Sequence, residues 1–211
     1  GNTVVIKSSE EAPAPVLEFA RLVDEAGFPP GVFNLITGFG EPCGRALTSH
    51  PLVSRVSFTG GTEAARNVVV NTANNFAHLS LELGGKSAAI VLDDTDVAAA
   101  AGGTAFTVCI HAGQGCALTT RLVVPREKYD EAVQSAADTM AAIGTADPAD
   151  PSAICGPVIS KVQRDRVEAY LRLAEEEGGT FATGGRVQIK EGDLAGGFWV
   201  EPTVIAGLDN S

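Results

Sequence analysis

The sequence has no cluster of basic residues and no long apolar run. Its 15 Lys and Arg residues stand against 26 Asp and Glu residues, which gives a net charge of −11. A nucleic-acid partner requires a basic surface, so we expect none. No apolar run approaches the roughly 18 residues that span a bilayer, so we expect no membrane partner either. No signal-peptide pattern opens the chain, which favours a cytoplasmic location.

Cysteines and aromatic residues are both few. The four cysteines, Cys43, Cys109, Cys116 and Cys155, form no CxxC pair and have no histidine at zinc-ligand spacing. We therefore predict no metal site, and free thiols in a reducing compartment. Three of the four are expected to be small buried hydrophobic residues. With 6% aromatic and 45% hydrophobic residues, an ordinary α/β core is expected.

An initiator methionine is also missing. The chain opens on Gly1-Asn2-Thr3-Val4-Val5-Ile6, which already resembles the edge of a strand. We therefore expect an internal piece of a longer protein.

Predicted strands alternate with predicted helices along the chain. Strands are expected at Thr3–Ile6, Val32–Ile36, Val53–Thr59, Ser87–Leu92, Leu118–Val124 and Phe198–Ile205. Helices are expected from a Ser8 or Ser9 cap to Gly27, up to about Ser49, from Gly60-Gly61-Thr62 to about Asn75, and over Val97–Ala112, Pro125–Ile143 and Lys161–Glu177. This alternation predicts an α/β fold with a doubly wound parallel sheet. The Gly84-Gly85 pair is the expected boundary between two domains, 1–84 and 85–211.

Cys116 is the first candidate for chemistry. It follows a predicted helix end and lies in the small-residue stretch Ala112-Gly113-Gln114-Gly115-Cys116, where the backbone can bend and a substrate can approach. A catalytic cysteine must be accessible and partly in the thiolate form. These residues alone leave both a reactive and a structural role open.

Glu82 is the second candidate and precedes Cys116 by 34 positions (116 − 82). In the run His78–Leu83 the leucines would share one face of a strand, with Glu82 on the opposite face. A solvent-facing carboxylate is therefore one interpretation. The glycine pair that follows suits a cleft, where a carboxylate with a raised pKa acts as a general base.

Two glycine-containing turns could bind a nucleotide. Gly38-x-Gly40-x-x-x-Gly44 nearly matches a dinucleotide fingerprint but has one residue too many before its last glycine. Gly60-Gly61-Thr62 follows a predicted strand and opens a helix, so its N–H groups could hold a pyrophosphate. Lys7 and Glu10 could hold a ribose, or could simply belong to the solvated first turn of a capped helix. The three histidines show no metal or triad spacing.

Taken together, these motifs resemble the NAD(P)-dependent aldehyde dehydrogenase superfamily over about Gly1 to Ile205. The run Leu81–Ser87 is similar to its glutamate motif, and Gly113-Gln114-Gly115-Cys116 to its cysteine motif. The segments 1–10 and 58–63 resemble its cofactor-binding segments, and Pro202-Thr203-Val204 a late strand of its catalytic domain. This resemblance implies part of a Rossmann-like NAD-binding domain followed by part of an α/β catalytic domain.

The resemblance also implies roles for the candidates. Cys116 would attack an aldehyde to give a thiohemiacetal, and its backbone N–H would form half of an oxyanion hole. After hydride transfer to the nicotinamide, Glu82 would activate water to hydrolyse the thioester. The cofactor would contact Lys7, Glu10, Gly40, Gly60, Gly61, Thr62, Leu83 and Gly84. A carboxylate at Glu10 would repel a 2′-phosphate, so NAD is expected over NADP, and the parent protein is expected to be a dimer or tetramer.

Departures from the family pattern concern cofactor loops and the nucleophile segment. Ser8 replaces a usual Pro, Gly61 a usual Ser and Ala65 a usual Gly, while Cys109 and His111 stand where Phe and Asn are common. The family's oxyanion-hole asparagine would lie before Gly1, and its nicotinamide-ribose glutamate after Ser211. We therefore expect the piece alone to be a poor catalyst.

Two alternative functions remain open. In the CoA-acylating branch of the family, CoA releases the thioester, and the general base is typically absent, so Glu82 argues against it. A non-catalytic fragment that only binds nucleotide would not need both Cys116 and Glu82.

Overall fold

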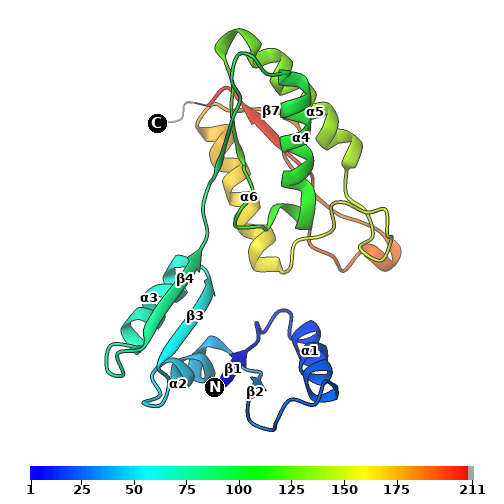
Figure 1. Ribbon diagram of the computed structural model, residues 1–211. Coiled ribbons are helices and arrows are strands. Elements are labelled where there is room, and N and C mark those ends of the chain that lie inside the picture. Colours follow the sequence, from blue (N-terminus) through cyan, green and yellow to red (C-terminus); the bar gives the residue numbers. More distant parts are fainter. Residues whose placement is uncertain (209–211) are drawn as a thin grey trace. The chain divides into compact units, whose positions relative to one another are not determined.

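The computed structural model describes residues 1–208 as two compact units, Gly1–Gly84 and a second that begins at Gly85 (Figure 1). This division falls at the predicted glycine pair. The strands are β1 (Val4–Lys7), β2 (Phe33–Ile36), β3 (Arg55–Gly60), β4 (His78–Leu83), β5 (Ala88–Ile90), β6 (Arg121–Val123), β7 (Thr180–Thr183), β8 (Val187–Gln188), β9 (Trp199–Val200) and β10 (Val204–Ala206). The α-helices are α1 (Ala14–Glu25), α2 (Arg45–Thr48), α3 (Thr62–Asn71), α4 (Val97–Cys109), α5 (Tyr129–Ile143) and α6 (Lys161–Glu176).

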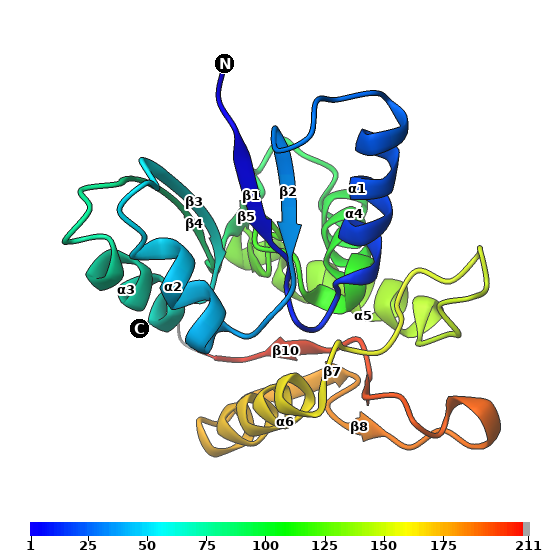
Figure 2. The ribbon, with the colours of Figure 1, turned by 90° about the horizontal axis from the view of Figure 1, so that it is seen from below.

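The first unit contains two parallel strand pairs. β1 pairs with β2, and β3 pairs with β4 in a register that sets Thr59 opposite Glu82. α1 lies along β2, where the rings of Phe19 and Phe33 meet edge to face with centroids 5.7 Å apart (Figure 2). α3 packs against β3 and β4. Both pairs are connected through helices, as parallel pairing requires.

The second unit packs its strand pairs with three helices. β5 and β6 are parallel, whereas β7 with β10 and β8 with β9 are antiparallel. α4 and α5 lie side by side (Figure 1). α5 also contacts β7 and β10, and α6 contacts β9. The predicted α/β class with parallel pairs is confirmed.

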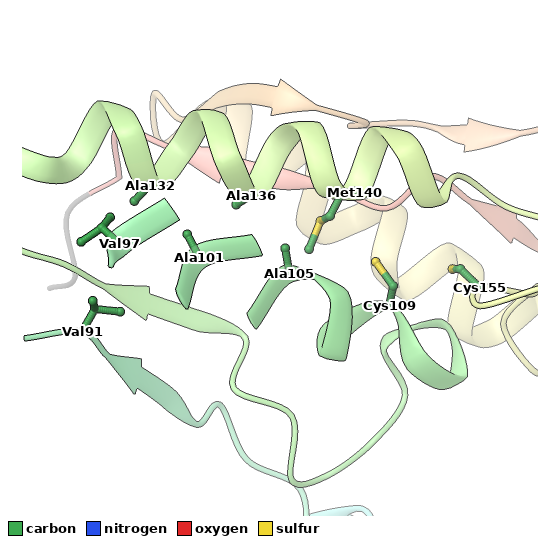
Figure 3. Close-up of a cluster of buried hydrophobic side chains, with 9 residues drawn as sticks. All are labelled: Val91, Val97, Ala101, Ala105, Cys109, Ala132, Ala136, Met140 and Cys155. Carbon is green, nitrogen blue, oxygen red and sulfur yellow. The ribbon is translucent and has the colours of Figure 1, made fainter. Parts of the chain in front are cut away.

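The core of this unit depends on small side chains. Ala101 and Ala105 of α4 lie near Ala132 and Ala136 of α5 (Figure 3). Alanines let two helices approach closely while their side chains still fill the interface. The remaining members of the cluster are Val91, Val97, Cys109, Met140 and Cys155. Cys109 and Cys155 therefore lie beside the end of α4 that leads to the Cys116 loop.

The predicted start of the first helix is wrong. Neither Ser8 nor Ser9 caps it: α1 begins at Ala14, and Glu10 lies before it. Pro13 and Pro15 explain the shift, because a helix that began at Ser8 or Ser9 would carry both prolines beyond its first turn, where a proline breaks a helix, whereas Pro15 lies in the first turn of α1. Ser8 instead continues the β1–β2 ladder through its N–H, which donates to the carbonyl oxygen of Ile36 at 3.1 Å.

Several predicted element ends were also wrong. α3 stops at Asn71 rather than near Asn75, whose side-chain amide instead donates to the carbonyl oxygens of Thr48 and His50. α4 stops at Cys109, and α5 begins only at Tyr129, after a short 3₁₀ turn at Arg126–Lys128.

The last predicted strand is in fact two. Pro202 lies between β9 and β10, and each pairs with a strand that was not predicted, β8 and β7 respectively. A proline cannot donate to a sheet ladder, which explains the interruption.

Candidate active site

Cys116 lies in an exposed turn and its thiol is free. α4 ends at Cys109 and a 3₁₀ turn follows at Ile110–Gly113. Within that turn His111 and Ala112 both have φ of 54°, and Gly113 has φ of 73°. The extended backbone of Ile110 ends the helix, and the three left-handed residues then carry the chain toward the cysteine. The predicted accessibility of Cys116 is thus present in the structure.

Gln114 links the Cys116 loop to a distant segment. Its side-chain oxygen accepts the N–H of Ile159 at 3.0 Å, and its side-chain nitrogen donates to the carbonyl oxygen of His111 at 3.0 Å. The backbone N–H of Gln114 donates to the same carbonyl at 3.2 Å. The sequence motif contained Gln114 but gave no sign of the partner at Ile159.

The other cysteines lie in different surroundings. Burial, with a contribution from Cys155, raises the pKa of Cys109 to about 11, and burial also raises the pKa of Cys155. Both are buried as predicted, whereas Cys43 is only half-buried. The buried thiols are therefore held in the protonated, unreactive form.

Glu82 occupies the face of β4 that the alternation predicted. Leu79, Leu81 and Leu83 are half-buried, while His78, Ser80 and Glu82 are exposed. Glu82 is next to the last residue of β4, two positions before Gly84. A carboxylate at the carboxyl end of a parallel strand lies where α/β folds place their ligand sites.

The ends of β1 and β2 bring Lys7 and Glu10 together. The Lys7 ammonium donates to the carbonyl oxygens of Ser8 at 2.6 Å and Gly38 at 2.7 Å, and lies 3.3 Å from the Glu10 carboxylate. The pKa of Glu10 is lowered, chiefly by a hydrogen bond from its own backbone N–H and further by Lys7. Partial burial acts in the opposite direction and raises this pKa. Glu10 is thus a carboxylate at neutral pH.

Glycines of the segment after β2 lie beside Lys7 and Cys43. A Cβ at Gly44 would lie 3.7 Å from the Lys7 side chain, and a Cβ at Gly38 only 2.7 Å from that of Cys43. Gly40 begins the π-helical turn Gly40–Gly44 that follows β2, and a Cβ there would meet no atom within 4 Å. The structure therefore brings Gly40 into the same turn region as Lys7, which the sequence could only suggest.

The N-terminus of α3 offers a second polar contact surface. Gly61 is its N-cap, has no side-chain cap, and a Cβ there would meet no atom within 4 Å. The first N–H groups of the helix, beginning at Thr62, are therefore available to an anion. Gly60 ends β3 and Leu83 ends β4, and the two are register partners.

Among residues 1–208, the buried hydroxyls of Ser8 and Thr120 have no hydrogen-bond partner. Ser8 is only 3% exposed and adjoins Lys7. A buried polar atom without a partner is costly, so it is a feature that a bound polar group could satisfy. The Ser8 hydroxyl and the open Gly40 are therefore two features near Lys7 that a bound polar group could use.

Cys116 lines neither of two cavities in the described part of the second unit. One of about 200 Å³ is lined by Val108, Cys109, Ala112 and Gly113 among others, so it backs the Cys116 loop. The other, of about 550 Å³, lies beside Thr139 and Ile143 at the end of α5. Within residues 1–208, no three His, Cys, Asp or Glu side chains gather in a way that could hold a metal ion. No described helix is long and apolar enough to cross a membrane.

Parallel strand pairs joined by helices, with glycine turns at their carboxyl ends, define the chain as an α/β protein of Rossmann-like type. It belongs to the aldehyde dehydrogenase family, whose sequence profile matches residues 1–211. The resemblance inferred from the motifs is thereby confirmed.

Individual relatives are similar over nearly the whole chain. The (Z)-2-((N-methylformamido)methylene)-5-hydroxybutyrolactone dehydrogenase of Acinetobacter baylyi is 43% identical over 97% of the chain and 41% of its own length. The 2-hydroxymuconic semialdehyde dehydrogenase of a Pseudomonas species is 42% identical over 99% of the chain and 43% of its own length. The chain thus spans less than half the length of these relatives.

Solved structures agree in fold. A variant of aldehyde dehydrogenase C from Pseudomonas syringae, in complex with NAD⁺ and octanal, has a TM-score of 0.94 at 36% identity, covering 99% of the chain and 43% of that protein. Betaine aldehyde dehydrogenase from Staphylococcus aureus, in complex with NAD⁺, has a TM-score of 0.90 at 38% identity, covering 98% and 42%.

Proposed function

We propose that this chain carries the nucleophile and the general base of an NAD-dependent aldehyde oxidation. The observation that carries the proposal is the contrast among its four cysteines, all within the described residues. Cys116 alone is exposed, in a glycine-rich turn, whereas the others are buried or half-buried. An exposed thiol between small residues suits attack on a carbonyl carbon.

The chemistry assigned to the side chains has two stages. Cys116 Sγ attacks the aldehyde carbon to form a thiohemiacetal, while its backbone N–H donates to the developing oxyanion. Bound NAD supplies the acceptor for the hydride that leaves this carbon. Cys116 then carries a thioester, and Glu82 takes a proton from the water that hydrolyses it to the carboxylic acid.

The first unit would then be part of an NAD-binding domain and the second part of a catalytic domain. Lys7 and Glu10 would hold the adenine ribose beside Gly40, and Gly60, Gly61 and Thr62 would approach the pyrophosphate at the N-terminus of α3. Leu83 and Gly84, at the carboxyl end of β4, would border the nicotinamide. The Glu10 carboxylate favours NAD, because a 2′-phosphate would lie against a negative charge. The NAD⁺ complexes of the two solved relatives support this choice.

The substrate would be a small aldehyde, and the parent protein a cytoplasmic homo-oligomer, dimer or tetramer. The octanal bound by the Pseudomonas syringae relative supports an aldehyde as the substrate class. Because Glu82 is present and exposed on β4, water rather than CoA is proposed to release the acid.

Site-resolved alkylation tests the proposal on the chain itself. Iodoacetamide is added with and without NAD, and mass spectrometry follows the four cysteines separately. We expect Cys116 to react fastest, at a rate that NAD changes, and Cys109 and Cys155 to react slowly. A Cys116 that reacts no faster than Cys43 and is indifferent to NAD would remove the basis for the proposal.

NADH formation provides a second measurement. We expect the chain alone to oxidise aldehydes far below the roughly 1–1,000 per second typical of enzymes, because it spans less than half the length of its relatives. Measured rates in that range would show that the chain needs no further segment. A dependence of product formation on added CoA would favour the acylating alternative.

A further inference from the structure

We infer that Gln114 is a positioning residue for Cys116. Its side-chain amide makes two hydrogen bonds: its nitrogen donates to the His111 carbonyl within the turn that precedes the cysteine, and its oxygen accepts the N–H of the distant Ile159. The inference rests on the proposed function in one respect, that Cys116 is a nucleophile toward carbonyl carbon. It adds a residue whose role is to fix the geometry of that attack.

The Ile159 end of this link is firmly anchored. The neighbouring residue Val158 is buried, and its N–H donates to the carbonyl oxygen of Phe198 at 2.9 Å. On the other side, Ser160 caps α6 by accepting the N–H of Gln163. Ile159 therefore belongs to a segment held at both neighbours, so that Gln114 ties the Cys116 loop to a fixed point 45 positions away.

The loop needs such a link because its backbone is strained. His111 and Ala112 adopt left-handed geometry, which costs roughly 1–2 kcal/mol for each residue with a Cβ. The His111 carbonyl accepts both the backbone and the side-chain N–H of Gln114, which fixes the turn in this geometry. Without the side-chain bonds, only the backbone N–H of Gln114 still holds the His111 carbonyl, at 3.2 Å.

The other side of Cys116 is held by packing. A Cβ at Gly115 would lie 3.0 Å from the Leu118 side chain, and the N–H of Leu118 donates to the Gly115 carbonyl at 3.4 Å. Cys116 thus lies between Gly115 and Leu118, which hold each other in place. Removing the Gln114 link frees only one side, so the thiol stays exposed but loses its fixed direction.

Two reactions of the same thiol separate direction from exposure. With 4-nitrophenyl acetate, Cys116 Sγ bonds to the acetyl carbon, 4-nitrophenolate leaves and the thiol proton passes to solvent. An oxyanion develops in this step, so oriented N–H donors accelerate it. With iodoacetamide, a sulfur–carbon bond forms and iodide leaves without any oxyanion, so exposure and the thiolate fraction decide the rate.

The test compares Gln114→Met, Gln114→Glu and the control Gln134→Met in the full chain. Methionine keeps the length of glutamine but removes both hydrogen bonds, and glutamate keeps the acceptor for Ile159 alone. Gln134 is an exposed residue of α5 whose side chain, among the described residues, bonds Asp138 of the same helix. Acetylation and alkylation of Cys116 are measured over pH 6–9 by mass spectrometry, with amide hydrogen exchange at Ile159.

We expect Gln114→Met to slow acetylation about tenfold or more, because the Cys116 N–H would no longer be oriented toward the oxyanion. Complete loss of an oxyanion donor costs about 10²–10³ in rate. Alkylation should stay within about twofold at every pH, exchange at Ile159 should accelerate, and Gln114→Glu should keep that exchange slow. The control should change nothing.

Equal losses in acetylation and alkylation, or unchanged exchange at Ile159 in Gln114→Met, would overturn the inference. The inference would also be overturned if, in the wild-type chain, the ratio of the acetylation rate to the alkylation rate were no higher at Cys116 than at Cys43. NAD-dependent alkylation is independent of these outcomes, so a failure here leaves the proposed function standing. If Gln114→Met does not fold, Gln114→Glu decides through its acetylation rate, which should fall while Ile159 stays protected.

Discussion

Cys109 and Cys155 lie in one buried cluster, where the Cys155 thiol adds to the effect of burial on the pKa of Cys109. The Cys109 pKa of about 11 stands above its ordinary value of 9.0. The folded state therefore holds the Cys109 proton more tightly than the unfolded state does. The contribution of this thiol to stability is complete below pH 9 and is lost as the pH rises toward 11. At about 1.4 kcal/mol for each pH unit, this loss is on the order of 2–3 kcal/mol.

We therefore expect the free energy of unfolding to fall between pH 9 and pH 11, and to fall less in Cys109→Ala. Alanine removes the titrating thiol and leaves only a small cavity. Urea unfolding at several pH values measures both slopes. Identical slopes of the free energy of unfolding against pH in the two proteins would show that Cys109 does not cause the loss of stability at alkaline pH.

The close approach of α4 and α5 gives a second prediction. Ala101 is 0% exposed and faces α5 (Figure 3). Ala99 on the same helix is exposed. Leucine at position 101 has no room, so Ala101→Leu should destabilise the second unit by about 1–3 kcal/mol. Ala99→Leu should change stability by less than about 0.5 kcal/mol. Thermal unfolding followed by circular dichroism compares the two variants, and equal effects would contradict the packing described for this interface.

Lys7 joins the ends of β1 and β2 through two carbonyl oxygens. Lys7→Met keeps the aliphatic stem but removes both bonds, and a bond to a charged group contributes about 1.5–3 kcal/mol. We expect a loss of about 2 kcal/mol in the stability of the first unit and weaker NAD binding. Lys161→Met is the matched control, because within residues 1–208 the exposed Lys161 ammonium pairs with Asp165 on its own helix, α6. A Lys7→Met variant as stable as this control would show that the two bonds contribute little.

Glu10 and Glu11 offer a test of cofactor choice. Glu10 contacts Lys7, whereas Glu11 is exposed and its side chain makes no described ion pair. We expect Glu10→Gln to shift the ratio of NADP to NAD affinity toward NADP by about tenfold, because the repelling charge is removed. Glu11→Gln should leave the ratio unchanged. Titration with both nucleotides by calorimetry measures it, and an unchanged ratio in Glu10→Gln would rule out discrimination by this carboxylate.

Glu82 should affect hydrolysis of the thioester rather than its formation. After acetylation of Cys116 by 4-nitrophenyl acetate, Glu82→Gln should leave the acetylation rate within about twofold and slow deacetylation by 10²-fold or more, the scale of general-base catalysis. Glu63→Gln, an exposed glutamate in the first turn of α3, is the control. Mass spectrometry of the acetylated chain over time gives both rates. Deacetylation that proceeds equally in all three proteins would remove Glu82 from the mechanism.

Much of the site could be predicted because its signals are local. The alternation in His78–Leu83 placed Glu82 on the exposed face, and small residues around Cys116 indicated an accessible turn. The start of α1 was missed although its signal is also local: Pro13 and Pro15 outweigh the capping serines. The splitting of the last strand at Pro202 belongs to the same kind of error.

The sequence by itself determined the α/β class, the family and the identity of the candidate residues, because periodicity and short motifs depend on neighbours along the chain. Only the tertiary structure decided which distant segments meet. It paired β7 with β10 and β8 with β9, joined Lys7 to Gly38 and placed Ile159 against Gln114. Such contacts depend on how separate elements pack, and no local pattern records the partner. The same packing buries Cys109 and Cys155 and leaves Cys116 exposed, a difference that the residue type cannot express.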